Sequence, residues 1–167
     1  MPSALTPLAN ITLSSNATTV TFSSISQGYE DLLFVISGTF TGTATFGAAG
    51  WRVNNDSGSN YNRVRIAGDG SSASSTTASG GNYGLGFNLH SSNSVNIMHF
   101  LDYSSTDKHK TVITRTGASA VNTELFLGRW ASTSAITSVT FYPPDAFGGT
   151  PDFFTAGSTF ALYGVSS

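Results

Sequence analysis

The chain has 167 residues, no cysteine, and seven basic against nine acidic residues, which gives a formal net charge of −2. A domain of this length can bury a sufficient core without covalent cross-links. The lack of cysteine excludes disulfides and cysteine-ligated metals. The few basic residues are scattered, which argues against nucleic-acid partners, and no apolar run approaches the roughly 20 residues of a membrane helix.

The composition indicates an all-β protein. Serine, threonine and glycine are abundant, the chain has 12 phenylalanines, and good helix formers are scarce. β-branched and aromatic residues favour strands, whereas Ser, Gly and Asn favour turns. We therefore predict a single jelly-roll-like antiparallel β-sandwich domain over residues 11–167, preceded by an extended N-terminal arm over residues 1–10.

The N-terminal arm has two interpretations. Pro2 and Pro7 favour an extended chain, and Leu5 and Leu8 lie between polar neighbours. Residues 1–10 are either a frayed terminus or an arm that docks on a neighbouring subunit or lattice through Leu5, Pro7 and Leu8.

Short strand-like segments follow along the rest of the chain. The segment 30–40 is a nearly continuous apolar run, which predicts a central strand covered on both faces. The segments 122–130 and 135–143 resemble a hairpin pair, and the Gly/Ser/Thr/Ala-rich segment 68–82 predicts a flexible exposed loop. Further strands are predicted at 11–13, 18–22, 44–53, 61–67, 83–89, 94–103, 111–116 and 158–165.

The segment VNNDSGSNYNRV, residues 53–64, is rich in oxygen-bearing side chains. A calcium loop would need several acidic residues at alternate positions, and Asp56 is the single acid in the segment. Asn, Asp and Gly also tolerate the left-handed backbone of tight connections. We predict a connection between the strand that ends at Val53 and the strand that begins at Tyr61, with no metal.

The sequence offers no catalytic or cofactor-binding motif. The three histidines lack metal-ligand spacing, and "GASAV" at residues 117–121 does not match the G-x-S-x-G nucleophile motif. We predict that the protein is not an enzyme and binds no cofactor.

Two groups of residues are candidates for contacts with partners. Trp51, Tyr61 and Trp130 could stack on sugars or lie in a subunit interface, although core packing is the simpler interpretation. Arg63, Arg65 and Arg129 fall at strand positions and could form ion pairs across subunits, the alternative being a solvated sheet face.

The order of segments resembles small β-sandwich structural proteins of tailed-bacteriophage virions. The similar segments are YEDLLFVISGTF, VNNDSGSNYNRVRIAGDG, FLDYSSTDKHKTVITRTG, LGRWASTSAITSVTFYPPD and the closing FTAGSTFALYGV. They extend over most of the chain, from about residue 20 to the end, and the final strand carries the strongest similarity.

This resemblance implies a virion structural protein without catalytic residues. The first expectation is a homotrimeric capsid decoration, or cement, protein that binds the major capsid protein at the capsid surface and stabilises the head. The alternative is a receptor-binding module of a tail fibre or spike that binds glycans of the host surface. Neither reading involves nucleic acid or a membrane as partner.

Overall fold

The computed structural model describes residues 4–118, 123–148 and 152–166. Within these ranges the chain forms twelve strands and no helix that could span a membrane. The strands are β1 (Leu5–Thr12), β2 (Val20–Phe22), β3 (Asp31–Gly38), β4 (Phe46–Val53), β5 (Tyr61–Gly68), β6 (Ala73–Gly81), β7 (Gly84–His90), β8 (Ser94–Leu101), β9 (Lys110–Ala118), β10 (Thr123–Trp130), β11 (Val139–Tyr142) and β12 (Thr159–Val165).

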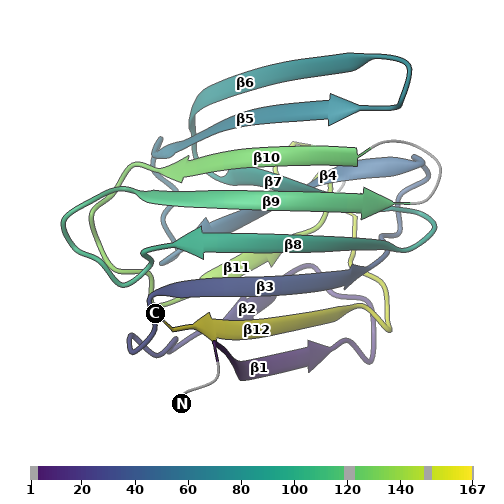
Figure 1. Cartoon of the computed structure of the whole chain (residues 1–167). Coiled ribbons are helices and arrows are strands. Elements are labelled where there is room, and N and C mark those ends of the chain that lie inside the picture. The colour runs from purple at the N-terminus through teal and green to yellow at the C-terminus, as the bar shows by residue number, and fades with distance from the viewer. Residues whose placement is uncertain (1–3, 119–122, 149–151, 167) are drawn as a thin grey trace.

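The strands form two antiparallel sheets that pack face to face. The eight-stranded sheet has the order β1-β12-β3-β8-β9-β10-β5-β6, and the four-stranded sheet has the order β2-β11-β4-β7. In Figure 1 the larger sheet lies in front and the smaller one behind it. The predicted all-β, single-domain antiparallel sandwich is confirmed.

Burial alternates strictly along β3, although residues 32–36 are apolar on both faces of the strand. Leu32, Phe34 and Ile36 are buried between the sheets, whereas Leu33 and Val35 point outward and are half-buried. The position of β3 inside the sheet is as predicted, but the described chain covers only one of its faces. The outward apolar residues of this strand are therefore left without a cover from their own chain.

Aromatic rings fill much of the space between the sheets. Phe34 is fully buried, with its ring centroid 5.3 Å from that of Phe22, 5.4 Å from that of Phe100 and 5.1 Å from that of Phe141. All three ring pairs are edge-to-face, the geometry that aromatic quadrupoles favour. These rings come from both sheets, so they tie the two layers together.

Two sequence predictions about connectivity are wrong. Residues 73–81 form the edge strand β6, paired with β5, although the segment is exposed as expected. β10 and β11 do not pair, since β10 lies between β9 and β5 and β11 lies between β2 and β4 in the other sheet. In each case backbone pairing determines the structure, with the preceding strand β5 for β6 and with β2 and β4 for β11, and local composition does not report it.

Residues 5–10 of the predicted arm belong to β1, which pairs along β12 at the edge of the larger sheet. Leu8 is partly buried against the core, and Leu5 is 45% exposed. Pro7 lies next to an irregularity in the β1–β12 register, as expected for proline in an edge strand. Residues 1–3 lie outside the described residues.

Candidate functional site

The three aromatic residues that the sequence proposed as sugar platforms are core residues. Trp51, Tyr61 and Trp130 are 1%, 2% and 3% exposed. The Trp51 ring packs edge-to-face on Tyr61, with centroids 5.3 Å apart, and burial raises the pKa of Tyr61 to about 12. None of the three presents a ring face to solvent, so the sugar-stacking role proposed for them is wrong and the core interpretation holds.

The 53–64 segment connects the two sheets through a fixed loop. Asn54 and Asn55 have φ of 52° and 55°, the left-handed conformation that asparagine tolerates. The Asn54 side chain accepts a hydrogen bond from the Thr137 backbone N–H at 2.8 Å and donates one to the Ala135 carbonyl at 2.8 Å. The predicted connection is confirmed, but it crosses between sheets and is therefore not a hairpin.

Asp56 is the centre of this loop. Its carboxylate accepts hydrogen bonds from Trp130 Nε1 at 2.6 Å, from Asn60 Nδ2 at 2.8 Å and from the Gly58 backbone N–H at 2.8 Å. Burial acts to raise the pKa of Asp56, but these hydrogen bonds outweigh it, so the pKa lies below its ordinary value. The carboxylate therefore fastens the loop to the sandwich.

We expect Asp56→Asn to lower the free energy of unfolding by about 1–3 kcal/mol at pH 7, because an amide cannot accept all three hydrogen bonds. The pKa of Asp56 is lower in the folded protein than in the unfolded one, so the stabilisation is fully present at pH values above the unfolded pKa of about 3.9. It is lost as the pH falls through the folded-state pKa. Urea unfolding at pH 7 and pH 3 should show a smaller difference between the two proteins at pH 3. An equal difference at both values would contradict this role.

Arg65 forms an intramolecular ion pair. Its guanidinium bonds the carboxylate of Glu124, which also accepts a hydrogen bond from Asn88 Nδ2 of β7. The Glu124 side chain is 1% exposed and that of Arg65 is 23% exposed. Arg65 thus has an ion-pair partner in its own chain, on the side of the eight-stranded sheet that faces the smaller sheet, and its role in a subunit contact stays a prediction.

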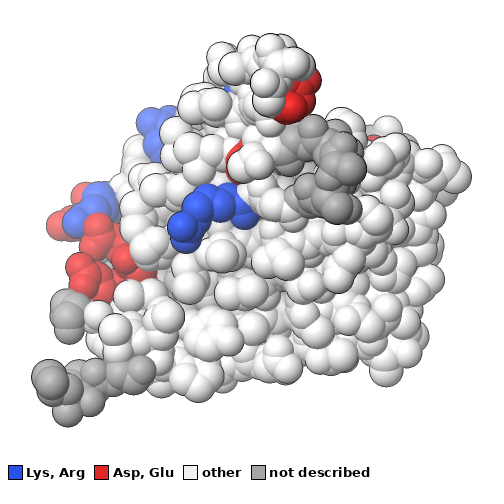
Figure 2. All heavy atoms as spheres, turned by 45° about the vertical axis from the view of Figure 1, so that its right-hand side comes forward, with Lys and Arg blue, Asp and Glu red and all other residues white. Residues whose placement is uncertain are grey.

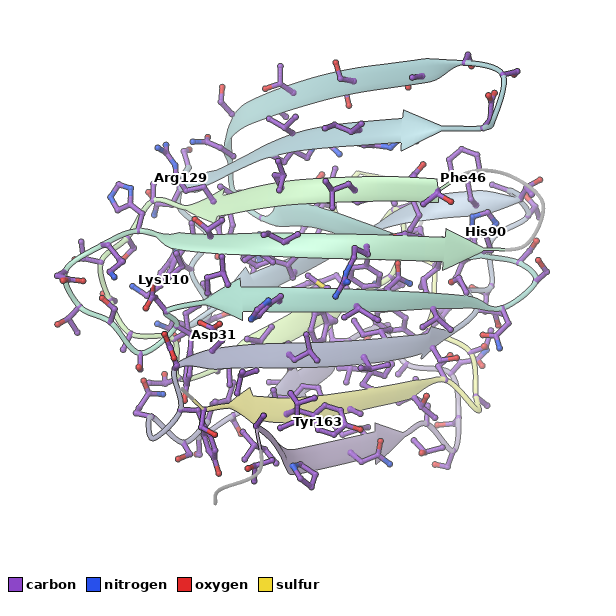
Figure 3. The ribbon with its side chains drawn as sticks, in the orientation of Figure 1. Asp31, Phe46, His90, Lys110, Arg129 and Tyr163 are labelled. Carbon is purple, nitrogen blue, oxygen red and sulfur yellow. The ribbon has the colours of Figure 1, made fainter. Side chains whose placement is uncertain are left out.

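Arg63 and Arg129 have other surroundings. Arg63 lines a hollow between β5, β6 and the start of β7, and Arg129 is exposed at the end of β10 (Figure 3). They remain candidates for contacts with partners.

His90 is the last residue of β7 and lies near Glu124. Its ring stacks on Phe46, with centroids 5.8 Å apart. Figure 3 labels both residues at the right-hand end of the sheets. Burial lowers the pKa of His90, and the Glu124 carboxylate opposes that shift. Among the described residues no three His, Asp or Glu side chains come together in a group that could hold a metal ion.

Aromatic residues that the sequence did not single out gather on the outer face of the four-stranded sheet. Tyr83 stacks on Phe147 with centroids 3.8 Å apart and planes inclined by 10°, and Tyr142 lies 4.7 Å from Phe147. The Arg52 guanidinium carbon lies 4.8 Å from the Phe147 centroid. We call Arg52, Tyr83, Tyr142 and Phe147 the aromatic platform.

The strand beneath the aromatic platform makes room for it. A Cβ at Gly50 would lie 3.0 Å from Phe147 Cε2 and 3.1 Å from Tyr83 Cδ2, so a glycine lets both rings approach the backbone of β4. Arg52 is held by a hydrogen bond from its Nε to the Asn82 carbonyl at 2.9 Å. The stack is therefore fixed by the sheet and by the turn before β7.

Tyr83 separates two hollows in the surface. The first has a volume of about 170 Å³ and is lined by Tyr61, Arg63 and Tyr83 among others. The second has a volume of about 180 Å³ and lies between Tyr83, Phe147 and Asp145. The half-buried Tyr83 ring thus has arginine donors and a carboxylate acceptor within the same stretch of surface.

Sequence reasoning missed the aromatic platform because it looked for tryptophans and for strand positions. Tyr83 and Phe147 each lie directly before a glycine in a connection between strands, and Tyr142 ends β11 before two prolines. No signal in the sequence separates them from core residues, because Phe154, in the same Pro/Gly-rich connection as Phe147, is fully buried. Their proximity could not have been foreseen, because it depends on which strands pair.

No protein-family model matches the chain, and no curated protein matches it. Among solved structures, the CBM40 module of a Ruminococcus gnavus IT-sialidase bound to α2,6-sialyllactose aligns at 11% identity and a TM-score of 0.38, covering 95% of this chain and 94% of that one. The same module, described without a ligand, aligns at 12% identity and a TM-score of 0.37, covering 95% of this chain and 94% of that one. An alginate lyase mutant in complex with alginate tetrasaccharide aligns at 8% identity and a TM-score of 0.34, covering 95% of this chain and 79% of that one. Similarities at this level carry no argument about ligand or activity.

Proposed function

We propose that the protein is a glycan-binding adhesion module, of the kind that a phage tail fibre or spike uses on a host surface. The observation that carries the proposal is the aromatic platform, where Tyr83 stacks on Phe147 beside Arg52 on the outside of the sandwich.

The chemistry of the aromatic platform suits a sugar. The C–H groups on one face of a pyranose ring pack well on an aromatic face, while its hydroxyls need donors and acceptors around the rim. Tyr83 offers the ring, Arg52 and Arg63 offer N–H donors, and Asp145 offers an acceptor in the adjoining hollows. A metal or nucleophile is not required for such binding.

We expect Tyr83→Ala to weaken glycan binding by about tenfold or more, because an aromatic contact contributes up to about 1.5 kcal/mol beyond its buried area. Glycans identified on an array would be titrated calorimetrically against the wild type and the variant. Tyr83→Phe keeps the ring and should retain most of the affinity.

Phe46→Ala is the matched control, since Phe46 is 42% exposed on β4 but stacks on His90 outside the aromatic platform. Equal affinity of wild type and Tyr83→Ala, or an equal loss in Phe46→Ala, would contradict the assignment of the site. An array without any bound glycan would contradict the proposed function itself.

A capsid decoration protein is the second candidate. The observation that favours it is Leu5, a large apolar side chain that is 45% exposed at the free edge of the eight-stranded sheet. An edge strand leaves backbone groups that another chain can pair with, so β1 could join a capsid subunit.

The substitution Leu5→Asp tests this candidate better than a deletion of residues 1–10. The deletion would remove most of β1 together with Leu8, which packs on the core, so it would disturb folding and contact together. If β1 binds the lattice, Leu5→Asp should retain its melting temperature and fail to co-sediment with phage heads from the same genome. Unchanged co-sedimentation, or no co-sedimentation of the wild type, would exclude this role.

A further inference from the structure

The outward side of the eight-stranded sheet is apolar over much of its width. Leu33, Val35, Ile97 and Ile113 are half-buried there, although no other element of the described chain covers them. Of the six large apolar side chains that are exposed in the described residues, four point to this side: Leu5, Val64, Ile66 and Val95. We call this side the outer apolar face.

The strand register aligns these residues in two rows across the sheet, because residues directly opposite each other in antiparallel strands share a face. The first row is Pro7, Tyr163, Leu33, His99, Ile113, Leu127, Val64 and Thr77. The second row is Asn10, Ala161, Val35, Ile97, Arg115, Leu125, Ile66 and Ser75.

The outer apolar face carries little charge. Among the described residues of the two rows, Arg115 is the single lysine or arginine. Nearer one end of the strands the same side also carries Arg129 and Asp31, and Asp31 pairs with His99 at 2.8 Å. Figure 2 shows part of this side and the adjoining end of the sheets, where uncharged residues predominate and charged ones are few. Tyr163 and Asp31 are both visible from this side in Figure 3. Two such faces would therefore repel each other only weakly.

The size of the outer apolar face matches a protein interface. Eight strands spaced about 4.8 Å apart give a width of about 34 Å, and outward side chains extend about 20 Å along each strand, so the face measures about 700 Å². A stable interface buries about 800 Å² on each partner. A face of this size suffices for a stable pair if most of it is covered.

We propose that the outer apolar face binds the same face of a second copy of this chain across a twofold axis. A contact between two different patches would need a second apolar patch. In the part of the chain that the structure describes, the exposed large apolar residues outside this face are Phe46 and Phe153, one residue each. A lipid surface would favour a cluster of basic residues around the face, and Arg115 and Arg129 do not form one. A sugar would favour aromatic rings, whereas the side chains of this face are mostly aliphatic.

The pairing explains the sequence of β3 without recourse to the proposed glycan function. A nearly continuous apolar strand is typical of a strand covered on both faces, and the second copy would provide the missing cover. The aromatic platform lies on the opposite side of the sandwich, so it would stay accessible in the pair. The two platforms of a pair would face away from each other, so each would bind its ligand separately.

The test is the molar mass of the full chain in sedimentation equilibrium at micromolar concentrations. We expect twice 17.4 kDa for the wild type and 17.4 kDa for Ile113→Glu, because each copy would bury a new charge in the centre of the interface. Phe153→Glu is the matched control, since it places the same charge on an exposed phenylalanine elsewhere and should leave the pair intact.

A second measurement does not depend on a charged substitution. The chain has no cysteine, so Leu127→Cys introduces a single thiol on the outer apolar face and Ser57→Cys introduces one in an exposed turn. In the pair, the thiol of Leu127→Cys should react slowly with a maleimide and faster on dilution, while that of Ser57→Cys reacts rapidly throughout. A monomeric or trimeric wild type, an Ile113→Glu variant that stays paired, or a freely reactive thiol in Leu127→Cys would overturn the proposal.

Discussion

Replacing Glu124 by alanine is expected to lower the free energy of unfolding by about 3 kcal/mol. Loss of one partner of a buried ion pair typically costs about 3–5 kcal/mol, because the other charge stays desolvated. Here Arg65 is 23% exposed, so water can reach part of its guanidinium, and the cost lies at the low end. Asn88 also loses the carboxylate that accepts its hydrogen bond.

Chemical denaturation at pH 7 measures this loss, with Thr123→Ala as a control on the adjacent exposed position of β10. The double variant Arg65→Met/Glu124→Gln removes both charges and should be more stable than Glu124→Ala, since no unpaired charge is left. If the double variant were less stable than Glu124→Ala, the attribution to an unpaired charge would be wrong.

Phe34→Ala is expected to lower the free energy of unfolding by about 3–5 kcal/mol. The ring is fully buried between both sheets and packs edge-to-face on Phe22, Phe100 and Phe141, so its removal leaves a cavity that rigid neighbours cannot fill. The adjacent Val35→Ala removes a half-buried side chain on the outer face and should cost less in the isolated chain.

The comparison is best made by denaturation of both variants at a concentration low enough to keep the chain monomeric. A loss of less than about 1 kcal/mol in Phe34→Ala would mean that the core tolerates the cavity, contrary to the packing described above.

The sandwich itself could be predicted because burial between sheets imposes a period of two on side chains. In β5 the residue types alternate, with Val64 and Ile66 on one face and Arg63 and Arg65 on the other. β3 was indicated instead by a nearly continuous apolar run, and its alternation in burial is visible only in the structure. The connection at Asn54 and Asn55 was predictable for a similar local reason, since both residues tolerate a positive φ.

Strand pairing could not be predicted from local composition. β6 consists of small and hydroxyl-bearing residues with no apolar alternation, and it is ordered as a strand by its backbone pairing with β5. β10 and β11 are neighbours in sequence but lie in different sheets, because each finds its partners elsewhere in the chain.

The candidate site was missed because large aromatic residues serve two purposes in this chain. Trp51 is enclosed by the fold, with Gly84 so close that a Cβ there would lie 2.2 Å from the indole. Tyr83 and Phe147 are 64 positions apart and meet only because β4, β7 and the connection after β11 share one surface. Residue type therefore did not distinguish core from surface, and position relative to turns does not do so either, because Tyr103 lies in a turn and is fully buried.

The most direct test of glycan binding at the aromatic platform is a protein-observed NMR titration with a glycan that the protein binds. We predict that the largest amide shifts occur at Arg52, Tyr83 and Phe147 and that Leu127, on the other side of the sandwich, stays unchanged. Shifts concentrated on the eight-stranded sheet, with residues 52, 83 and 147 unchanged, would contradict the account and place the ligand elsewhere.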